Sequence, residues 1–457
     1  MSCMRFYDIV VQVAIIRPGP IVGRMVNPFL QRRQGREEVT YAHPSLEPVL
    51  KRTLGVPLFQ EQLLRIAMIA ANFTGGEAEE LRRAMGFKRS QARMKEIEAR
   101  LRAGMTQNGI TPKAQEEIIL SITSFALYGF PESHAASFAL IAYASAYLKE
   151  HYLAAFTAAL LNNQPMGFYS PATIVKDAQR HGLKVLPIDV TRSEWKCTLE
   201  QVASRESRAP SASEVVALRM GLRYVRGLRE EVGQALVQER LRAPFTSIHD
   251  LTWRVPELRK DEVATLAGIG ALNFIGLQID SRSGLNRRDA LWQVERAVRA
   301  SGPLLEQQPE ADSPSPLAPM NHEERLVADF HGTGLTVGPH PMAYRRAWLN
   351  AMGIRRASEL RDIPSGKRLR IGGCVITRQR PGTAKGFVFI SLEDETGVAN
   401  AIITPDLFHQ NRLLLASERF LAIEGILQNQ DNVISVRAER VQPLFVTKAE
   451  TASHDFH

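Results

Sequence analysis

The chain has 457 residues, of which 44% are hydrophobic, and it carries a formal net charge of +9 with an isoelectric point near 9.6. At ~100–200 residues per domain, this length predicts two to four domains. The basic balance favours a polyanionic partner such as nucleic acid, although many basic proteins bind none. Three distant cysteines argue against a disulfide framework or a cysteine zinc site. Without a signal peptide or an apolar run of membrane length, we expect a reduced cytoplasmic protein with no membrane partner.

The first part of the chain is predicted to be mostly helical. The apolar run at residues 9–16 is the exception and predicts a buried strand that stops at Arg17-Pro18-Gly19-Pro20. Residues 61–71 form one predicted helix. Thr74 and Glu77 match a capping box for a second helix, which Gly86 ends.

Two further helices are predicted after residue 110. Thr111-Pro112 supplies an N-cap and a first-turn proline for the first of them. Its apolar positions, which we expect in the core, are Ile118, Ile119, Ile122 and Phe125. This helix ends at Gly129. Ser133 is then expected to cap a long helix that ends near Asn162.

The predicted secondary structure of the remaining chain changes from short helices to a linker and then to strands. A short strand is predicted within "LKVLPIDV" (183–190), and short helices separated by glycines follow over 222–276. A Pro/Ser/Glu-rich linker covers 301–320. After residue 365 the pattern becomes alternating, with predicted strands in "RLRIGGCVITRQ", "GFVFISLEDETG", "VANAIIT", "FLAIEGILQ" and "VISVRAERVQPL". Five strands of this size favour a small barrel of the OB-fold type.

Two motifs in the helical region could bind a phosphate. Arg82 and Arg83 lie in the last turn of the capped helix, with Lys88 and Arg89 just beyond. Cations there either complement the helix dipole or clamp phosphate oxygens with their guanidinium groups. Ser133 and His134 open the next long helix, whose free N–H groups favour anions, and Tyr128 before it could stack on a base. An ordinary N-cap with a packed tyrosine is the alternative.

Two glycine turns between short helices could offer backbone N–H groups to DNA phosphates. The first contains Arg226 and Gly227, but Arg229 stands where a second glycine would be, so this match is weaker. The second, with Gly268 and Gly270, follows a helix that begins near Lys260. A lone Gly-x-Gly is a common loop, and the neighbouring helices make the signal more specific.

The barrel region carries cations close to aromatic residues, a combination suited to single-stranded nucleic acid. Arg370, Arg378 and Lys385 lie near Phe387 and Phe389 in the sequence. The alternative is that the phenylalanines fill the barrel core and the charges are solvated. A search for catalytic residues finds no Asp-x-Asp, no Ser-His-Asp pattern and no P-loop, and "LEDETG" (392–397) falls on a predicted hairpin turn, a poor metal site.

Several blocks, taken in chain order, resemble one family. They are "IIRPGPIVG", "HPSLEPVL", "GVPLFQEQ", "LRRAMGFK", "YGFPESHAASFALIAY" and "LKVLPIDV". Together they resemble the C-family bacterial replicative DNA polymerases, typified by the DNA polymerase III alpha subunit. The segment "GLTVGPHPMAYRR" after the linker is most similar to the error-prone branch of that family. The resemblance covers essentially the whole chain.

This resemblance implies template-directed addition of deoxynucleotides to a primer. Arg82 and Arg83 match positions in the fingers that hold the incoming triphosphate, and Tyr128, Ser133 and His134 match the segment lining the nascent base pair. Family members also carry an N-terminal PHP domain and a palm whose aspartates bind two Mg²⁺ ions. Those regions would precede Arg17 and are absent. The chain thus resembles a C-terminal fragment, a truncated gene product or half of a split polymerase, and we expect it to be inactive alone.

The fold expected from these observations is a multidomain α+β protein. Helical polymerase fingers would occupy 1–170, a mixed segment and a helix-hairpin-helix region 171–300, a linker with connecting helices 301–364, an OB-fold 365–446 and a tail 447–457. The error-prone branch implies a role in damage repair, tolerance or translesion synthesis. Expected partners are primer–template DNA and deoxynucleoside triphosphates. A separate palm-bearing chain, a sliding clamp or translesion partners remain open, as does the alternative of a non-catalytic DNA-binding module.

Overall fold

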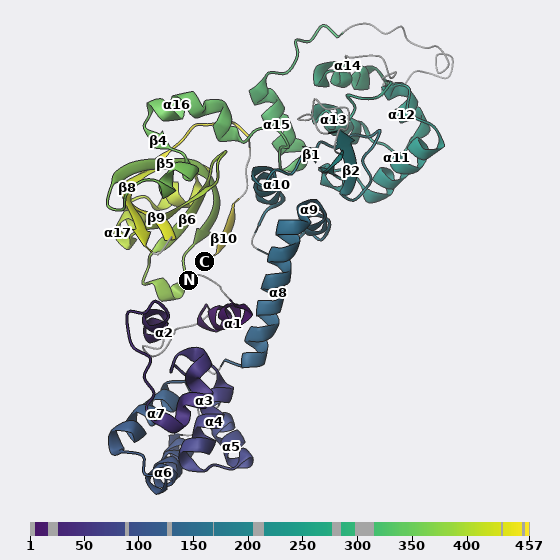
Figure 1. Ribbon diagram of the computed structural model, residues 1–457. Coiled ribbons are helices and arrows are strands. Elements are labelled where there is room, and N and C mark those ends of the chain that lie inside the picture. The colour runs from purple at the N-terminus through teal and green to yellow at the C-terminus, as the bar shows by residue number, and fades with distance from the viewer. Residues whose placement is uncertain are drawn as a thin grey trace. The chain divides into compact units, whose positions relative to one another are not determined.

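The computed structural model describes residues 5–16, 26–86, 91–125, 130–167, 169–203, 214–276, 285–297, 315–430, 433–449 and 453–456. The chain divides into two compact units, Met1–Leu148 and Lys149–His457, and Figure 1 gives the element labels used below. In the described part of the chain, no helix is both long enough and apolar enough to cross a membrane.

Unit 1 is helical, as expected. Its helices are α1 (Phe6–Ile15), α2 (Val26–Arg33), α3 (Glu47–Leu50), α4 (Gln60–Ala71), α5 (Gly75–Gly86), α6 (Gln91–Gln107), α7 (Pro112–Phe125) and α8 (Glu132–His151), with 3-10 turns η1 (Pro44–Leu46) and η2 (Lys51–Thr53). The core forms where α4 crosses its neighbours, and it buries Leu63 of α4 and Ile97 of α6. A side chain at Gly104 of α6 would place its Cβ 2.1 Å from the Ala71 carbonyl oxygen, so this crossing requires glycine.

The strand predicted at residues 9–16 is wrong, because this segment lies in helix α1. Val10, Val11 and Ala14 are buried against Ala135 and Ala139 of α8. Side chains also join the two helices, since the Tyr7 hydroxyl donates to Glu132 at 2.7 Å and the ring of Phe6 lies edge-on to that of Tyr143. Propensity favoured a strand for these β-branched residues, and tertiary packing overrides that weak preference.

The predicted capping signals at α5 and α7 are confirmed. The Thr74 N–H donates to the Glu77 carboxylate at 2.8 Å, and the Glu77 N–H donates back to Thr74 Oγ1 at 3.3 Å. The Ala114 N–H donates to Thr111 Oγ1 at 3.4 Å. These interactions are local, and sequence spacing alone was sufficient to locate them.

The long helix after residue 130 differs from the prediction at both ends. α8 begins at Glu132, one residue before Ser133, so Ser133 is not its N-cap. The helix stops at His151, and α9 (Leu153–Asn162) continues after a break at Tyr152.

Unit 2 begins with helices around a small sheet. The helical elements after α9 are α10 (Pro171–Arg180), η3 (Leu222–Tyr224), α11 (Glu230–Arg242), α12 (Ile248–Arg254), α13 (Lys260–Gly268), α14 (Arg287–Ala297), α15 (His322–Thr333), η4 (Pro341–Arg345), α16 (Arg346–Ala351) and η5 (Ala357–Arg361). Strands β1 (Val185–Leu186), β2 (Thr198–Ala203) and β3 (Glu214–Arg219) form a three-stranded sheet in the order β1-β3-β2. The short strand expected within "LKVLPIDV" is therefore present as β1.

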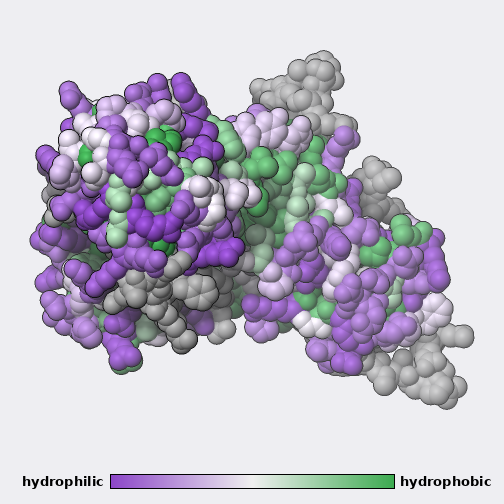
Figure 2. Space-filling view, turned by 90° about the horizontal axis from the view of Figure 1, so that it is seen from below, coloured by the Kyte–Doolittle hydropathy of each residue, from purple (hydrophilic) through white to green (hydrophobic). Residues whose placement is uncertain are grey.

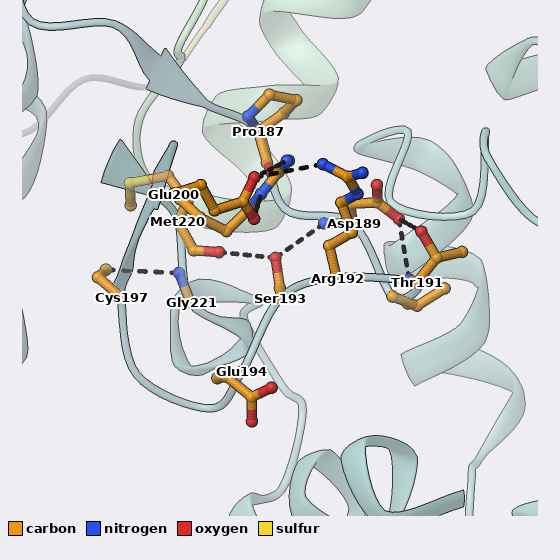
Figure 3. Close-up of polar contacts among 12 residues, drawn as sticks. Pro187, Asp189, Thr191, Arg192, Ser193, Glu194, Cys197, Glu200, Met220 and Gly221 are labelled. Atoms are coloured by element: carbon orange, nitrogen blue, oxygen red, sulfur yellow. Dashed lines mark hydrogen bonds and ion pairs between the residues drawn. The ribbon is translucent and has the colours of Figure 1, made fainter. Parts of the chain in front are cut away.

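Buried polar groups fix the turn that follows β1 (Figure 3). Arg219 is 5% exposed, and it pairs with Glu200 at 2.7 Å while donating to the Pro187 carbonyl oxygen at 2.9 Å. The Ser193 hydroxyl donates to the Met220 carbonyl oxygen at 2.8 Å. Burial raises the pKa of the neighbouring Cys197 thiol to about 11, so this cysteine is a packing residue and a poor nucleophile.

The C-terminal part of unit 2 is a closed barrel, which confirms the OB-fold prediction. All five expected strands are present, namely β5 (Arg368–Gln379), β6 (Val388–Glu393), β7 (Val398–Ile403), β8 (Phe420–Gln430) and β9 (Val433–Pro443). They pair in the order β5-β6-β7-β9-β8, and β8 pairs with β5 to close the barrel. Helices α17 (Pro405–Gln410) and α18 (Arg412–Ser417) connect β7 to β8, while β4 (Ile354–Arg355) and β10 (His454–Phe456) extend the sheet from β5.

A buried polar network joins α10 to this barrel. Arg180 of α10 forms an ion pair with Glu393 of β6 at 2.9 Å. Lys176, one turn earlier, donates to the Gly338 carbonyl oxygen, and His340 lies with its Nε2 3.8 Å from the Glu393 carboxylate. Lys176, His340 and Glu393 are each less than 10% exposed. The segment "GLTVGPHPMAYRR" is therefore packed between the helical part of unit 2 and the barrel, and we name this network the α10–barrel junction.

The ionisation of Glu393 should make the stability of unit 2 depend on pH. Burial raises the pKa of Glu393 to about 7 although Arg180 and Lys176 lower it. The pKa of this carboxyl is higher in the folded protein than in the unfolded chain. Its contribution to stability is therefore fully present below the unfolded pKa, and it is lost as the pH rises through the folded pKa of about 7. Between pH 4.5 and 7, Glu393 should therefore reduce the free energy of unfolding by up to ~3 kcal/mol.

Urea unfolding of the wild type and Glu393→Gln at pH 5 and 7.5 measures this effect. The wild type should lose stability relative to the variant as the pH rises. Glu231→Gln, at a side chain that is 74% exposed, is the control and should follow the wild type. Parallel curves for the wild type and Glu393→Gln would contradict the assignment.

Candidate nucleotide and DNA-binding surfaces

The first turn of α8 forms one side of an open hollow of about 530 Å³. Phe130, Pro131, Ser133, His134 and Ser137 line it. Ser133 and His134 are both exposed, and the imidazole of His134 lies edge-on to the rings of Phe130 and Phe138, with centroids 5.4 and 4.7 Å away. Ser133 and His134 both line this hollow, and their role as nucleotide contacts stays a prediction. Tyr128 lies outside the described residues.

Carboxylates already occupy part of this helix terminus. The N–H of Glu132 donates to Glu61 at 2.9 Å, and the Glu132 carboxylate accepts a hydrogen bond from the Tyr7 hydroxyl at 2.7 Å. Arg52 stacks over the Tyr7 ring, with its guanidinium carbon 3.6 Å from the centroid, and burial with the Glu132 contact raises the pKa of Tyr7. The helix dipole favours an anion here, but Glu61 and Glu132 oppose it. A triphosphate would need further cations.

Arg82 and Arg83 are exposed on α5 and share one carboxylate. Arg82 donates to Glu79 at 2.8 and 2.6 Å, and Arg83 donates to the same group at 3.3 Å. The hydrogen bond from Arg82 is the main reason that the pKa of Glu79 falls to about 2. Among the described residues, no hydrogen bond or ion pair joins either arginine to the α8 hollow. Lys88 lies outside the described residues.

The first glycine turn, the weaker match in the sequence, is the more open of the two. Gly227 has a φ of +82°, which glycine adopts readily, and both it and Arg226 are exposed. Arg226 donates to the His331 carbonyl oxygen at 3.3 Å, and its guanidinium lies beside Gly334, where a Cβ would be 2.9 Å from Nη2. A phosphate contact at this exposed turn stays a prediction.

The second glycine turn does not present free N–H groups at the predicted positions. Gly268 is the last residue of α13, and the Gly270 N–H donates to the Ala267 carbonyl oxygen at 3.0 Å. Turns, and not a second helix, follow over 269–276. Gly270 has a φ of +83°, a left-handed backbone conformation that favours glycine, so this glycine has a backbone role in the turn. Lys260 is exposed but pairs with Glu295 at 2.7 Å.

Glu262 joins the first glycine turn to the start of α13. It is 2% exposed, and it accepts hydrogen bonds from the Arg229 side chain at 3.0 Å and from the backbone N–H groups of Arg229 and Arg259 at 3.1 and 2.9 Å. Burial alone would raise the pKa of Glu262, but these hydrogen bonds outweigh it and lower the pKa to about 2. Arg229, at the position where a second glycine was expected, is the residue that forms the hydrogen bonds to Glu262.

The outer face of β6 and β7 combines aromatic and polar groups. Phe389 is 37% exposed, so it is not a core residue, and it lies opposite Ile402 on β7. Ser391 and Asn400, the next outward pair, are hydrogen-bonded at 2.9 Å. Exposed cations flank this face at Lys385, before β6, and at Arg437, which pairs with Ile402 from β9. The sequence reading missed Arg437 because its neighbour in the barrel is distant in the chain.

Two of the barrel cations that were predicted to contact DNA already interact with other groups of the protein. Arg378 is 9% exposed and donates to the Leu415 carbonyl oxygen at 2.7 Å and to Asp455 at 3.2 Å, so its guanidinium is bound within the protein and this geometry does not support a DNA contact. Arg370 is exposed, but it shares Glu424 with Arg368 at 2.8 and 3.4 Å. Glu424 offsets part of their positive charge.

The described residues contain no group of three or more His, Cys, Asp or Glu side chains that could hold a metal ion. In the "LEDETG" turn, Asp394 accepts hydrogen bonds from Thr396 and Gly397, and Glu395 pairs with Arg346 at 2.5 Å. These carboxylates stabilise a hairpin and do not fit the two-metal chemistry of DNA synthesis.

Comparisons with known proteins agree with this order of elements. Family models match residues 1–109 as "Bacterial DNA polymerase III alpha subunit finger domain", 182–282 as "Helix-hairpin-helix motif" and 369–444 as "OB-fold nucleic acid binding domain". The error-prone DNA polymerase of Anaeromyxobacter sp. (strain K) is 47% identical over 458 residues, covering 99% of this chain. That of Pseudomonas syringae pv. syringae (strain B728a) is 43% identical over 455 residues, again covering 99%. The chain belongs to the error-prone branch of the C-family bacterial DNA polymerases.

The chain spans 39% and 42% of the length of those two relatives. Among solved structures, asparaginyl-tRNA synthetase from Pyrococcus horikoshii aligns with 19% of this chain and 21% of its own length, at 21% identity. The TM-score of that alignment is 0.16, and it carries no argument about function.

Removing the Glu262 bridge should destabilise the helix-hairpin-helix region. Glu262→Ala leaves two backbone N–H groups and a guanidinium without their acceptor, which should cost about 2–3 kcal/mol in the free energy of unfolding. Glu231→Ala is the matched control, since Glu231 is exposed and lies 4.0 Å from the same arginine. Chemical denaturation measures both. Equal stabilities for the two variants would show that Glu262 does not stabilise the contact between the first glycine turn and the start of α13.

Proposed function

We propose that this chain supplies the incoming-nucleotide and DNA contacts of an error-prone DNA polymerase acting in damage repair or tolerance. The observation that carries the proposal is the alignment of 99% of the chain with relatives named error-prone DNA polymerase. The hollow at the start of α8 supports a nucleotide contact through Ser133 and His134. Catalytic Mg²⁺ would be held by carboxylates other than those of the "LEDETG" turn, which are occupied, and the described residues contain no other group that could hold a metal ion.

DNA contacts are proposed at two surfaces of unit 2. The open turn at Arg226 and Gly227 would contact a duplex phosphate without reading bases. The β6–β7 face would hold single-stranded DNA, with Phe389 stacking on a base and Lys385 and Arg437 near the backbone. A hollow of about 380 Å³ that includes Ser358, Arg361 and Asn400 adjoins this face. Gly268, Gly270 and Arg378 leave the proposed contact set for the reasons given above, and Lys260 and Arg370 remain as secondary cations.

Single-stranded DNA binding should depend on Phe389 and on salt. Phe389→Ala should weaken binding roughly 5- to 100-fold, because a stacked base contributes ~1–3 kcal/mol. Phe445→Ala is the matched control at an aromatic side chain that is 84% exposed. Fluorescence anisotropy with a labelled oligonucleotide across a salt series should show affinity falling steeply as counterions compete. Salt-independent binding, or equal losses in both variants, would reject this surface.

The arginine pair on α5 should affect nucleotide use and not folding. Replacing Arg82 and Arg83 with Gln should leave the melting temperature nearly unchanged, because both side chains are exposed. In a chimera that carries this chain in place of the aligned segment of the Anaeromyxobacter polymerase, the double variant should lose at least ~100-fold in kcat/KM for a deoxynucleotide. DNA affinity should change much less. Single-nucleotide incorporation is the measurement, and near wild-type kinetics would leave the pair with only a helix-dipole role.

The alternative function is a DNA-binding module without catalysis. The lack of a metal-holding group among the described residues is consistent with either proposal. Primer extension by the same chimera distinguishes the polymerase proposal from the non-catalytic module. A folded chimera that binds DNA but does not extend a primer would favour the module.

A further inference from the structure

A hollow of about 380 Å³ lies beside the first half of strand β7. Its walls come from η5 before the barrel, from the turn and strand that begin β7, and from Ile434 of β9. All of these elements belong to the C-terminal part of unit 2. Sites for small ligands typically have volumes of ~300–1,000 Å³, so the hollow has the size of a binding site.

Incomplete pairing of β7 leaves this space open. Among the described residues, β7 pairs with β9 only at Ala401 and Ile402, so Val398–Asn400 has no strand partner on that edge. η5 packs beside the open edge, where the Ser358 N–H donates to Thr396 Oγ1 at 3.1 Å. An unpaired strand edge leaves backbone N–H and C=O groups available to another molecule.

Three of the side chains that line the hollow are hydrogen-bond donors. Arg361 is exposed and makes no hydrogen bond or ion pair with any other described residue. The side-chain Oδ1 of Asn400 accepts a hydrogen bond from Ser391 at 2.9 Å, so its Nδ2 group has no partner among the described residues. The Ser358 hydroxyl is also exposed. A guanidinium, an amide and a hydroxyl suit a ligand that is rich in acceptors and negatively charged.

The hollow also has an aliphatic side. Hydrophilic residues cover most of the molecular face drawn in Figure 2. The lining of the hollow is more mixed, because it includes Ile434 and Val398, which is 41% exposed. Aliphatic groups beside hydrogen-bond donors fit a flat heterocycle that is apolar on its faces and carries acceptors at its edge. A nucleobase joined to a phosphate has all of these features.

The hollow lies along the proposed single-strand surface. Phe389 of β6 is opposite Ile402 of β7, and Val398 is four residues earlier in β7. At ~3.3 Å per residue, Val398 is roughly 13 Å along the strand from the position of Phe389. A single strand that stacks one base on Phe389 and follows β7 therefore reaches the hollow.

We propose that the hollow binds one nucleotide of this single strand. The base lies against Val398 and accepts a hydrogen bond from the Asn400 amide, and the phosphate pairs with Arg361. Thymine suits the amide, because its O2 and O4 atoms are acceptors. This inference rests on the proposed function and adds to it a contact with a base edge, which a surface that only neutralises phosphates lacks.

Fluorescence anisotropy with two labelled octamers tests the proposal on the 457-residue chain. One probe is oligothymidylate, and the other has the same sugar–phosphate backbone without bases. Asn400→Ala should weaken binding of the thymidylate roughly 2- to 10-fold and leave binding of the abasic probe unchanged. Arg361→Gln should weaken binding of both probes at least ~10-fold, and it should reduce the slope of log affinity against log salt by about 0.7, because one phosphate contact is lost.

Arg355→Gln is the matched control, because Arg355 is 60% exposed and does not line the hollow. It should bind both probes as the wild type does. An equal loss in Arg355→Gln and Arg361→Gln would overturn the proposal, since general charge would then explain both. Equal losses of the two probes in Asn400→Ala would overturn the base contact. All three variants should keep the wild-type circular dichroism and melting temperature, since these side chains are exposed.

Phe389→Ala distinguishes failure of this inference from failure of the proposed function. If Phe389→Ala weakens binding of the thymidylate but neither hollow variant does, the strand uses the β6–β7 face without the hollow, and the inference alone fails. If the wild type binds neither probe, the single-strand surface and the hollow fail together.

Discussion

The buried ion pair between Arg180 and Glu393 connects the helical part of unit 2 with the barrel. An uncompensated charge in this position would be costly, so each partner requires the other. Lys176 and His340 complete the junction, and burial lowers the pKa of Lys176 to about 8. Two residues of α15 make further contacts: Asp329 pairs with Arg287 at 2.7 Å, and Glu323 accepts a hydrogen bond from Thr447 at 2.5 Å. These contacts fix the β6–β7 face relative to the glycine turns.

That arrangement gives physical meaning to two DNA surfaces within one unit. The open turn at Gly227 and the outer face around Phe389 belong to parts that the junction holds together. In the proposed function, a duplex phosphate contact and a single-strand contact would act on one DNA molecule. Binding at one would then raise the effective concentration at the other without any new interaction, and such contacts would position a template without reading its sequence.

The sequence was most informative where structure depends on neighbouring residues. Alternation located all five barrel strands, and Thr74 with Glu77 located the start of α5. The sequence patterns failed to predict the structure where contacts between residues distant in the chain determine it. The apolar residues of α1 are buried in one cluster with Ala135 and Ala139 of α8. α8 begins at Glu132, whose N–H donates a hydrogen bond to Glu61. Glu262 and Glu393 were missed because their partners are remote in the chain. Ser133 and His134 were singled out from the residues at a predicted helix start, and their role in nucleotide binding stays a prediction from the resemblance. The occupied N–H of Gly270 could be seen only in the structure.

The central claim is that this chain is the nucleotide- and DNA-contacting portion of a polymerase whose metal-binding carboxylates lie elsewhere. Primer extension with Mg²⁺ and all four deoxynucleotides tests it most directly, comparing the purified 457-residue chain with the same chain placed in the Anaeromyxobacter polymerase framework. The account predicts no extension by the chain alone and template-directed extension by the chimera. Extension by the isolated chain that disappears when one of its own residues is changed would contradict the claim. So would a folded chimera that cannot extend a primer.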